Sequence, residues 1–160
     1  MKEKIIDTER AATISKELRE KGRRLVFTNG CFDLLHVGHV RYLEAARALG
    51  DALIVAINGD DSVRALKGEG RPLNREAERA EVIAALECVD YVVIFPEVRA
   101  TALLEKVRPA IYVKGGDYTT ATLDGEERGA LELAGAEIRI LPFESGYSTS
   151  ALVEKMRALP

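Results

Sequence analysis

Apolar runs alternate with helix-like patterns along the whole chain. The longest run, Ala52 to Ile57, is continuous, as expected for a parallel strand that is covered on both faces. Shorter runs predict further strands over residues 25–28, 91–95, 111–113 and 137–141. The spacing of apolar residues between these runs predicts helices over residues 7–21, 37–49, 75–87, 99–107, 128–134 and 148–158. Alternating strands and helices predict a three-layer α/β fold with a central, mainly parallel five-stranded sheet.

Polar segments follow the strands of this Rossmann-like pattern. They comprise residues 29–39, 58–61, 114–118 and 144–150, of which 58–61 is predicted to be a turn and 114–127 a loop. Ligands of such sheets bind beyond the carboxyl ends of the strands, where the strand order reverses. We therefore expect these segments to meet at one end of the sheet. We expect residues 1–160 to form a single domain, with an N-terminal helix within 1–22 and the core in 23–160.

Composition and charge narrow the range of partners. The 160 residues are 47% hydrophobic and 31% charged, with a net charge of −3 that predicts no basic surface for nucleic acid. No apolar stretch is long enough to span a bilayer, and the charged N-terminus lacks the apolar centre of a signal peptide. Cys31 and Cys88 form neither a disulfide framework nor a metal-ligand spacing. We expect a cytoplasmic protein that binds neither nucleic acid nor membranes.

The only two histidines, His36 and His39, follow a predicted strand and precede a predicted helix. Positions three apart share a helix face, so both imidazoles can point at one ligand. Backbone N–H groups at a helix start favour a phosphate, and imidazoles there can stabilise negative charge in a transition state. Gly38 between them would let a phosphate approach the backbone. The alternatives are a metal pair, which would need a third ligand and is commonly spaced four apart, or two unrelated surface histidines.

A glycine-broken loop and the helix after it carry three cations. Lys67 and Arg71 lie in the loop, where they could close over a polyanion, and Arg79 lies on the following helix. A solvated loop beside a charged helix face is the alternative. These cations are therefore candidates for neutralising phosphate charge.

Two later segments also suit a phosphate. Lys114 at the end of a predicted strand, followed by Gly115, can present an ammonium group and backbone N–H groups, or can form a flexible turn. Ser148, Thr149 and Ser150 begin the last helix, where hydroxyls can cap the helix or bind phosphate together with the helix dipole.

Two residues of the turn before the histidines allow several roles. Asp33 can bind Mg²⁺, accept a hydrogen bond from substrate, or only shape the turn. Cys31 at a helix start can be a thiolate nucleophile, although a small turn residue near the phosphates is the preferred interpretation.

Residues 32–39 resemble the HxGH signature of the nucleotidylyltransferase superfamily, which includes the cytidylyltransferases. Residues 29–33, 66–74 and 113–118 are similar to segments of one branch, the adenylyltransferase domain of bifunctional ADP-heptose synthase. This resemblance, over about residues 22–157, implies adenylyl transfer from ATP to D-glycero-β-D-manno-heptose 1-phosphate, with Mg²⁺ bound with the nucleotide. The alternatives are CTP-dependent transfer to glycerol 3-phosphate or a similar small phosphate ester, and a non-catalytic nucleotide-binding module.

The resemblance also implies residue roles and partners. The catalytic set is His36, His39, Lys67 and Arg79. With the two histidines, the nucleotide-binding set is Asn29, Gly30, Cys31, Phe32, Asp33, Gly38, Lys114, Gly115, Ser148, Thr149 and Ser150. The substrate-binding set is Asp33, Asn58, Asp60, Arg71, Lys114 and Asp117, and no residue is assigned as a metal ligand. We expect a homodimer, and we expect any kinase on a separate chain because 160 residues are too few for both domains.

Overall fold

The computed structural model describes residues 2–116, 119–142 and 146–159. Its centre is a six-stranded sheet in the order β1-β4-β3-β2-β5-β6, in which all neighbouring strands are parallel. The strands are β1 (Ile5–Ile6), β2 (Leu25–Gly30), β3 (Ala52–Asn58), β4 (Tyr91–Phe95), β5 (Ile111–Gly115) and β6 (Glu137–Leu141). The α/β fold is confirmed. The predicted count of five strands was one short, because the two residues of β1 are too few to form a recognisable pattern.

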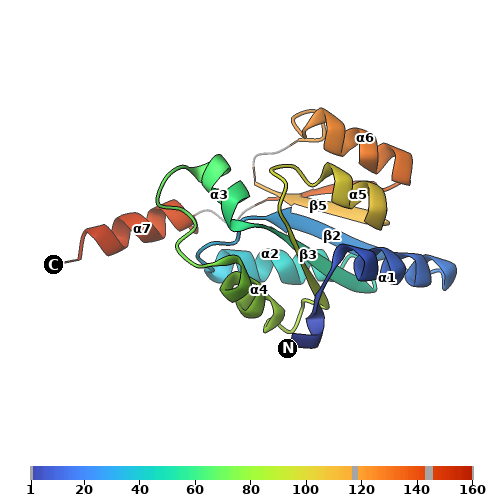
Figure 1. Ribbon diagram of the computed structural model, residues 1–160, viewed down its shortest axis with the longest axis horizontal. Coiled ribbons are helices and arrows are strands. Elements are labelled where there is room, and N and C mark those ends of the chain that lie inside the picture. The colour runs from blue at the N-terminus through green and yellow to red at the C-terminus, as the bar shows by residue number, and fades with distance from the viewer. Residues whose placement is uncertain (1, 117–118, 143–145, 160) are drawn as a thin grey trace.

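Helices cover both faces of the sheet (Figure 1). The chain begins with a short 3-10 helix (Lys2–Lys4). The α-helices are α1 (Thr8–Glu20), α2 (Val37–Arg47), α3 (Asp60–Lys67), α4 (Glu76–Ala84), α5 (Thr101–Val107), α6 (Gly125–Ala134) and α7 (Thr149–Arg157). Helices α1, α5 and α6 pack on one face, and α2 and α4 pack on the other. The three layers match the prediction from alternating strands and helices.

Two apolar cores follow from the alternation of side chains along each strand. Leu25 and Phe27 of β2 face the layer of α1, α5 and α6, whereas Val26 faces α2 together with Leu43 and Ala46. Every residue of β3 is buried, as its continuous apolar run predicted. Burial of each large apolar side chain contributes about 1.5–3 kcal/mol, so both faces of the sheet hold its strands in register.

Three differences from the predicted helices bear on the site. Residues 58–61, predicted to be a turn, lead directly into α3, so Lys67 ends a helix and does not lie in a loop. Helix α4 begins after Arg75 and not after Asn74, whose side-chain amide instead donates to the carbonyl of Asp33. Helix α6 begins at Gly125, three residues before the predicted start, and is capped by Asp124.

Helix α7 extends away from the body of the domain (Figure 1). It contains no buried residue, and Met156 near its end is half exposed. None of the described helices is long and apolar enough to cross a membrane.

Candidate active site

The strand order reverses between β2 and β5, which are neighbours in the sheet. A cavity of about 740 Å³ lies at their carboxyl ends, where ligands of open α/β sheets bind. Of the predicted site residues, its lining includes Asn29, Gly30, Cys31, Phe32, Asp33, His39, Asn58, Lys67, Arg71, Lys114, Gly115, Thr149 and Ser150. His36, Gly38, Asp60, Arg79 and Ser148 are not part of the lining, and Asp117 lies outside the described residues.

A tight turn after β2 positions the first part of the cavity. Phe32 adopts a left-handed backbone conformation with φ of 46°, and its ring lies 5.5 Å from that of His39. A Cβ at Gly30 would approach the Phe32 ring to 3.0 Å, so a larger residue there would have to displace the ring. Burial raises the pKa of the Cys31 thiol despite the nearby Lys67 and Arg79. The thiol is therefore protonated, which favours the small turn residue over the nucleophile.

The two histidines lie together at the start of α2. Their ring centroids are 4.0 Å apart, and the backbone N–H of His36 points at Nδ1 of His39, 3.4 Å away. Because Nδ1 of His39 is the acceptor, its proton lies on Nε2. Nδ1 of His36 is buried and has no hydrogen-bond partner among the described residues. Such an atom is usually satisfied by a ligand or water.

Burial lowers the pKa of both imidazoles. The pKa of His39 falls to about 4, because its ring is desolvated and because a charge on His36 would oppose a second one. Burial also lowers the pKa of His36. Both rings are therefore neutral at pH 7 in the free protein, and His39 presents a neutral N–H donor to the cavity.

Gly38 has a different role from the one predicted. A Cβ at this position would lie 3.0 Å from the ring of His36 and 3.0 Å from Cβ of Tyr147. The space beside its backbone is therefore filled by protein side chains and is not open to a phosphate. The Tyr147 ring also lies 5.7 Å from the guanidinium of Arg41, a cation–π contact that holds the segment before α7 against α2.

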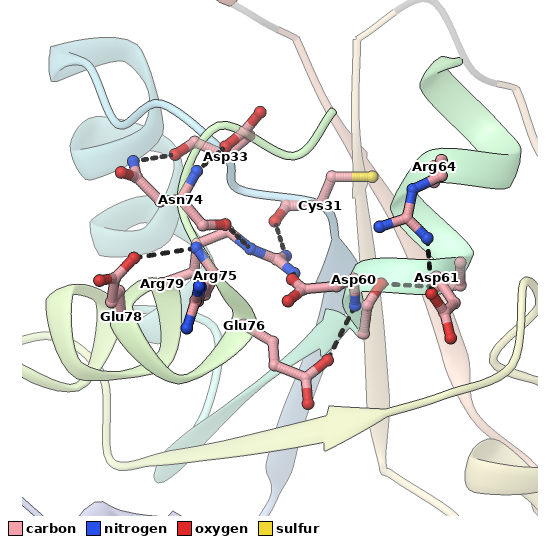
Figure 2. A network of polar contacts seen from close by, with 12 residues as sticks. Cys31, Asp33, Asp60, Asp61, Arg64, Asn74, Arg75, Glu76, Glu78 and Arg79 are labelled. Carbon is pink, nitrogen blue, oxygen red and sulfur yellow. Dashed lines mark hydrogen bonds and ion pairs between the residues drawn. The ribbon is translucent and has the colours of Figure 1, made fainter. Parts of the chain in front are cut away.

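Arg79 is outside the cavity lining and instead holds the turn after β2 through a network of polar contacts (Figure 2), which corrects the expectation that it contacts phosphate. Its side chain is 1% exposed, and it donates to the carbonyls of Cys31 at 2.6 Å and Asn74 at 3.0 Å. Its third partner is the Asp60 carboxylate at 2.8 Å. Asp60, expected to bind substrate, is thus occupied as the counter-ion of Arg79. All three nitrogens of the guanidinium are engaged in positioning the chain.

Asp33 shapes the loop before α4. Its buried carboxylate accepts from the backbone N–H groups of Leu73 at 2.8 Å and Asn74 at 3.0 Å. It also pairs with Nε of Arg71 at 2.8 Å, which brings Arg71 to the cavity wall. Three roles were left open for Asp33, and its contacts show that it shapes the backbone. Its side chain also lines the cavity.

Lys67 and Lys114 supply cations from two sides. Lys67 is exposed at the end of α3, whereas Lys114 is half-buried on β5. Burial lowers the pKa of Lys114, and the carboxylate of Glu127 partly offsets this. The two cations and the start of α2 make this part of the cavity suitable for phosphate groups.

The three hydroxyls at the start of α7 separate into two roles. Ser148 caps the helix, because its Oγ accepts from the backbone N–H of Ala151 at 3.0 Å. Thr149 and Ser150 line the cavity, and Oγ1 of Thr149 donates to the carbonyl of Leu34 at 3.3 Å. Ser148 is therefore the capping residue, whereas Thr149 and Ser150 are the hydroxyls that lie where a ligand could reach them.

The sequence profile of the cytidylyltransferase-like family matches residues 27–155, which include the histidine pair and all the cavity segments described above. The chain belongs to the cytidylyltransferase-like family. The bifunctional protein HldE of Geotalea uraniireducens is 51% identical over 96% of this chain, and HldE of Nitratiruptor sp. is also 51% identical over 96%. The chain spans about a third of the length of these relatives, 31% and 32% respectively.

Two solved structures share the fold of this family member. The lipopolysaccharide core biosynthesis protein from Thermoplasma volcanium superposes with a TM-score of 0.64 at 28% identity, over 79% of this chain and 100% of its own. Pantoate-beta-alanine ligase from Francisella tularensis superposes with a TM-score of 0.58 over 91% of this chain and 68% of its own. At 15% identity, this likeness shows only that the two chains share a fold.

Two tyrosines that the sequence did not single out hold the site. The hydroxyl of Tyr42 lies 2.8 Å from Oγ1 of Thr28 and donates to the carbonyl of Val113 at 3.2 Å, which links α2 to β2 and β5. Tyr112 donates to Oδ1 of Asn29 at 2.7 Å. Helical periodicity marks Tyr42 only as a core position, so no local pattern indicated its polar contacts.

A second group of lining residues comes from the starts of α5 and α6. It consists of Val98, Arg99, Thr122, Leu123, Asp124 and Glu127. The four residues before and within the first turn of α6 were missed because residues 114–127 were predicted to be a loop and the start of α6 was placed too late. A helix cap at Asp124 was the available signal.

Proposed function

We propose that this domain transfers an adenylyl group from ATP to D-glycero-β-D-manno-heptose 1-phosphate. A phosphate oxygen of the acceptor attacks the α-phosphorus of ATP, and the bond from that phosphorus to the bridging oxygen of the leaving group breaks. The products are ADP-heptose and pyrophosphate, and no covalent enzyme intermediate is needed. Such transfers depend mainly on positioning and on charge stabilisation.

The observation that carries this proposal is the histidine pair at the start of α2, beside the cavity at the reversal of strand order. His39 offers Nε2–H to the oxygen on which negative charge grows during the transfer. Lys67, Lys114 and Arg71 neutralise the phosphates, and Thr149 with Ser150 supplies hydroxyl donors. Arg79 acts indirectly, through the position of the turn.

Mg²⁺ is proposed to enter with the nucleotide. Among the described residues, no group of three or more histidine, cysteine, aspartate or glutamate side chains is placed to hold a metal ion. Mg²⁺ commonly keeps several waters and binds through phosphates with one or two carboxylates, so a cage of protein ligands is not required. Asp33 is a carboxylate that lines the cavity beside Arg71, although its oxygens already hold the loop. When bound, the ion would neutralise phosphate charge.

The choice of acceptor is supported by the relatives. Two HldE proteins are 51% identical over nearly the whole chain, and the motifs in residues 29–33, 66–74 and 113–118 resemble the adenylyltransferase domain of ADP-heptose synthase. The similar protein from Thermoplasma volcanium is a lipopolysaccharide core biosynthesis protein, which also favours a sugar phosphate as the acceptor.

Pyrophosphate release tests the proposal. Purified protein with Mg²⁺ is given ATP or CTP in turn, each with heptose 1-phosphate or glycerol 3-phosphate. Release with ATP and heptose 1-phosphate is the expected result. Release only with CTP and glycerol 3-phosphate would retain the chemistry and overturn the substrates. Nucleotide binding without release for any pair would favour a non-catalytic module.

The proposed assembly is a homodimer in the cytoplasm, supplied with heptose 1-phosphate by a kinase. Helix α7 supports the dimer, because Met156 is 53% exposed on it and no residue of the helix is buried. Light scattering coupled to size-exclusion chromatography would give twice the monomer mass of 17.5 kDa if the dimer forms.

A further inference from the structure

The cavity has two chemically different ends. One end carries Lys67, Arg71 and the start of α2, which suit a chain of phosphates. The other end, at the starts of α5 and α6, carries the carboxylates of Asp124 and Glu127, the hydroxyl of Thr122, and the guanidinium of Arg99, whose charge is balanced by its ion pair with Asp124. Carboxylates repel phosphate and accept hydrogen bonds from hydroxyl groups. The second end therefore suits a neutral part of a substrate that is rich in hydroxyls.

The contacts of the two carboxylates differ. Asp124 uses Oδ1 to cap α6, accepting from the backbone N–H groups of Glu126 and Glu127, and its Oδ2 pairs with Arg99 at 3.3 Å. Both of its oxygens are therefore engaged. Glu127 is only 5% exposed, and its Oε1 accepts from the backbone N–H of Ala100 at 2.8 Å.

The second oxygen of Glu127 is the informative atom. Within the described parts of the chain, the bond to Ala100 is the one hydrogen bond that this carboxylate receives. A buried carboxylate normally has more partners, because its two oxygens together offer about four acceptor positions. Glu127 lines the cavity, so the missing donor can come from a ligand.

We propose that Glu127 binds a hydroxyl group of the acceptor's sugar and so selects hydroxyl-rich phosphate esters. The inference rests on the proposed function, because it assigns the second end of the cavity to the acceptor. ATP carries several phosphate charges and fits the cationic end, whereas a sugar 1-phosphate has one phosphate and an otherwise uncharged ring. When the α-phosphate of ATP and the phosphate of the acceptor meet near His39, the sugar ring of the acceptor extends towards α6.

Glu127 also affects Lys114 electrostatically. Burial lowers the pKa of Lys114, and the Glu127 carboxylate is the largest opposing influence. Cys31 raises this pKa as well, whereas Arg99 and Lys67 lower it. Removing the charge at position 127 should therefore lower the pKa of Lys114 further, and the alkaline limb of the pH profile of kcat/KM should move to lower pH.

The test compares Glu127→Gln with Glu126→Gln. The amide oxygen of glutamine can still accept from Ala100, so the start of α5 stays held while the charge is lost. Glu126 is the neighbouring residue on the same helix turn, but it is exposed and lies outside the cavity lining, which makes it a matched control. Thermal unfolding of both variants should stay within a few degrees of the wild type.

Glu127→Gln should raise KM for heptose 1-phosphate about tenfold and leave KM for ATP within about twofold, the scale of losing a charged hydrogen-bond acceptor. A series of singly deoxygenated heptose 1-phosphates identifies the hydroxyl. The wild type should discriminate against one of them about tenfold, and the variant should lose that discrimination. The alkaline limb should shift in Glu127→Gln and not in Glu126→Gln.

A raised KM for ATP in place of the acceptor would overturn the inference, as would identical kinetics in the two variants. If the wild type uses a different acceptor, the proposed substrate fails, and the same comparison with that acceptor still tests Glu127. If the wild type shows no turnover, calorimetric titration with heptose 1-phosphate replaces kinetics, and equal binding by wild type and Glu127→Gln would refute the inference.

Discussion

Replacing His39 tests the centre of the proposed mechanism. Asparagine places an amide atom close to where Nδ1 of His39 accepts from His36 N–H, so His39→Asn keeps that contact and removes Nε2. Glutamine is longer, and its amide nitrogen can approach the position of Nε2. His39→Gln is therefore the matched control, because it restores a donor without an imidazole.

The expected magnitude follows from the state of the ring. A preorganised donor to a developing oxyanion contributes about a hundredfold to a thousandfold in kcat. His39 is neutral at pH 7, since its pKa lies at about 4, and a neutral donor contributes less than a charged one. We therefore expect His39→Asn to lower kcat about a hundredfold, which corresponds to about 2.7 kcal/mol of transition-state stabilisation.

The assay is steady-state pyrophosphate release at saturating ATP and acceptor, with circular dichroism as a check on folding. His39→Gln should recover part of the rate, to within about tenfold of the wild type, if donation from the Nε2 position is what matters. Folded His39→Asn with kcat near that of the wild type would refute the assigned role. A raised KM with unchanged kcat would show that His39 stabilises the ground state and the transition state equally.

Three further predictions concern stability. Arg79→Met leaves two carbonyls and the partly exposed Asp60 carboxylate without the buried guanidinium that pairs with them, so it should cost about 3 kcal/mol and lower Tm by roughly 10 °C in a calorimetric scan. Tyr42→Phe removes the hydroxyl that joins α2 to two strands, and urea unfolding should show a loss of about 1–2 kcal/mol with the fold retained. The free energy of unfolding should fall as pH is lowered from 6.5 towards 4, because His39 takes up a proton at a higher pH in the unfolded chain than in the folded protein. Urea titrations at several pH values should show a smaller fall for His39→Asn.

Periodicity of apolar residues predicted the strands and helices that bury an apolar face. The bounds of β4 and β6 match the predicted residues, because their apolar patterns each end at a proline. Helix α3 was missed for the opposite reason. Its sequence is mostly charged or polar, and its start depends on the distant Glu76, which accepts from the backbone N–H of Asp60 at 2.8 Å. A contact of that kind leaves no local pattern.

The site residues divide in the same way. The histidine pair was recognisable because its strand, turn and helix are contiguous in the chain. The role of Arg79 was not, because its bond to the carbonyl of Cys31 spans 48 residues. Likewise, the surroundings of Gly38 depend on Tyr147, which approaches only in the folded chain. Sequence patterns therefore indicate which side chains suit a phosphate, whereas long-range packing decides which of them the cavity exposes.

Ion pairing explains why these cations do not share one role. Arg79 is paired with Asp60, Arg71 with Asp33, and the charge of Glu127 acts on Lys114. Each of these partners fixes or tunes a cation before a ligand arrives, and preorganised charge costs no rearrangement during the reaction. Lys67 differs, because it is exposed and forms no ion pair with a described residue. In the proposed reaction, the exposed Lys67 at the end of α3 neutralises the leaving pyrophosphate, Arg71 and Lys114 hold the reacting phosphates, and Arg79 acts only through the turn that it positions.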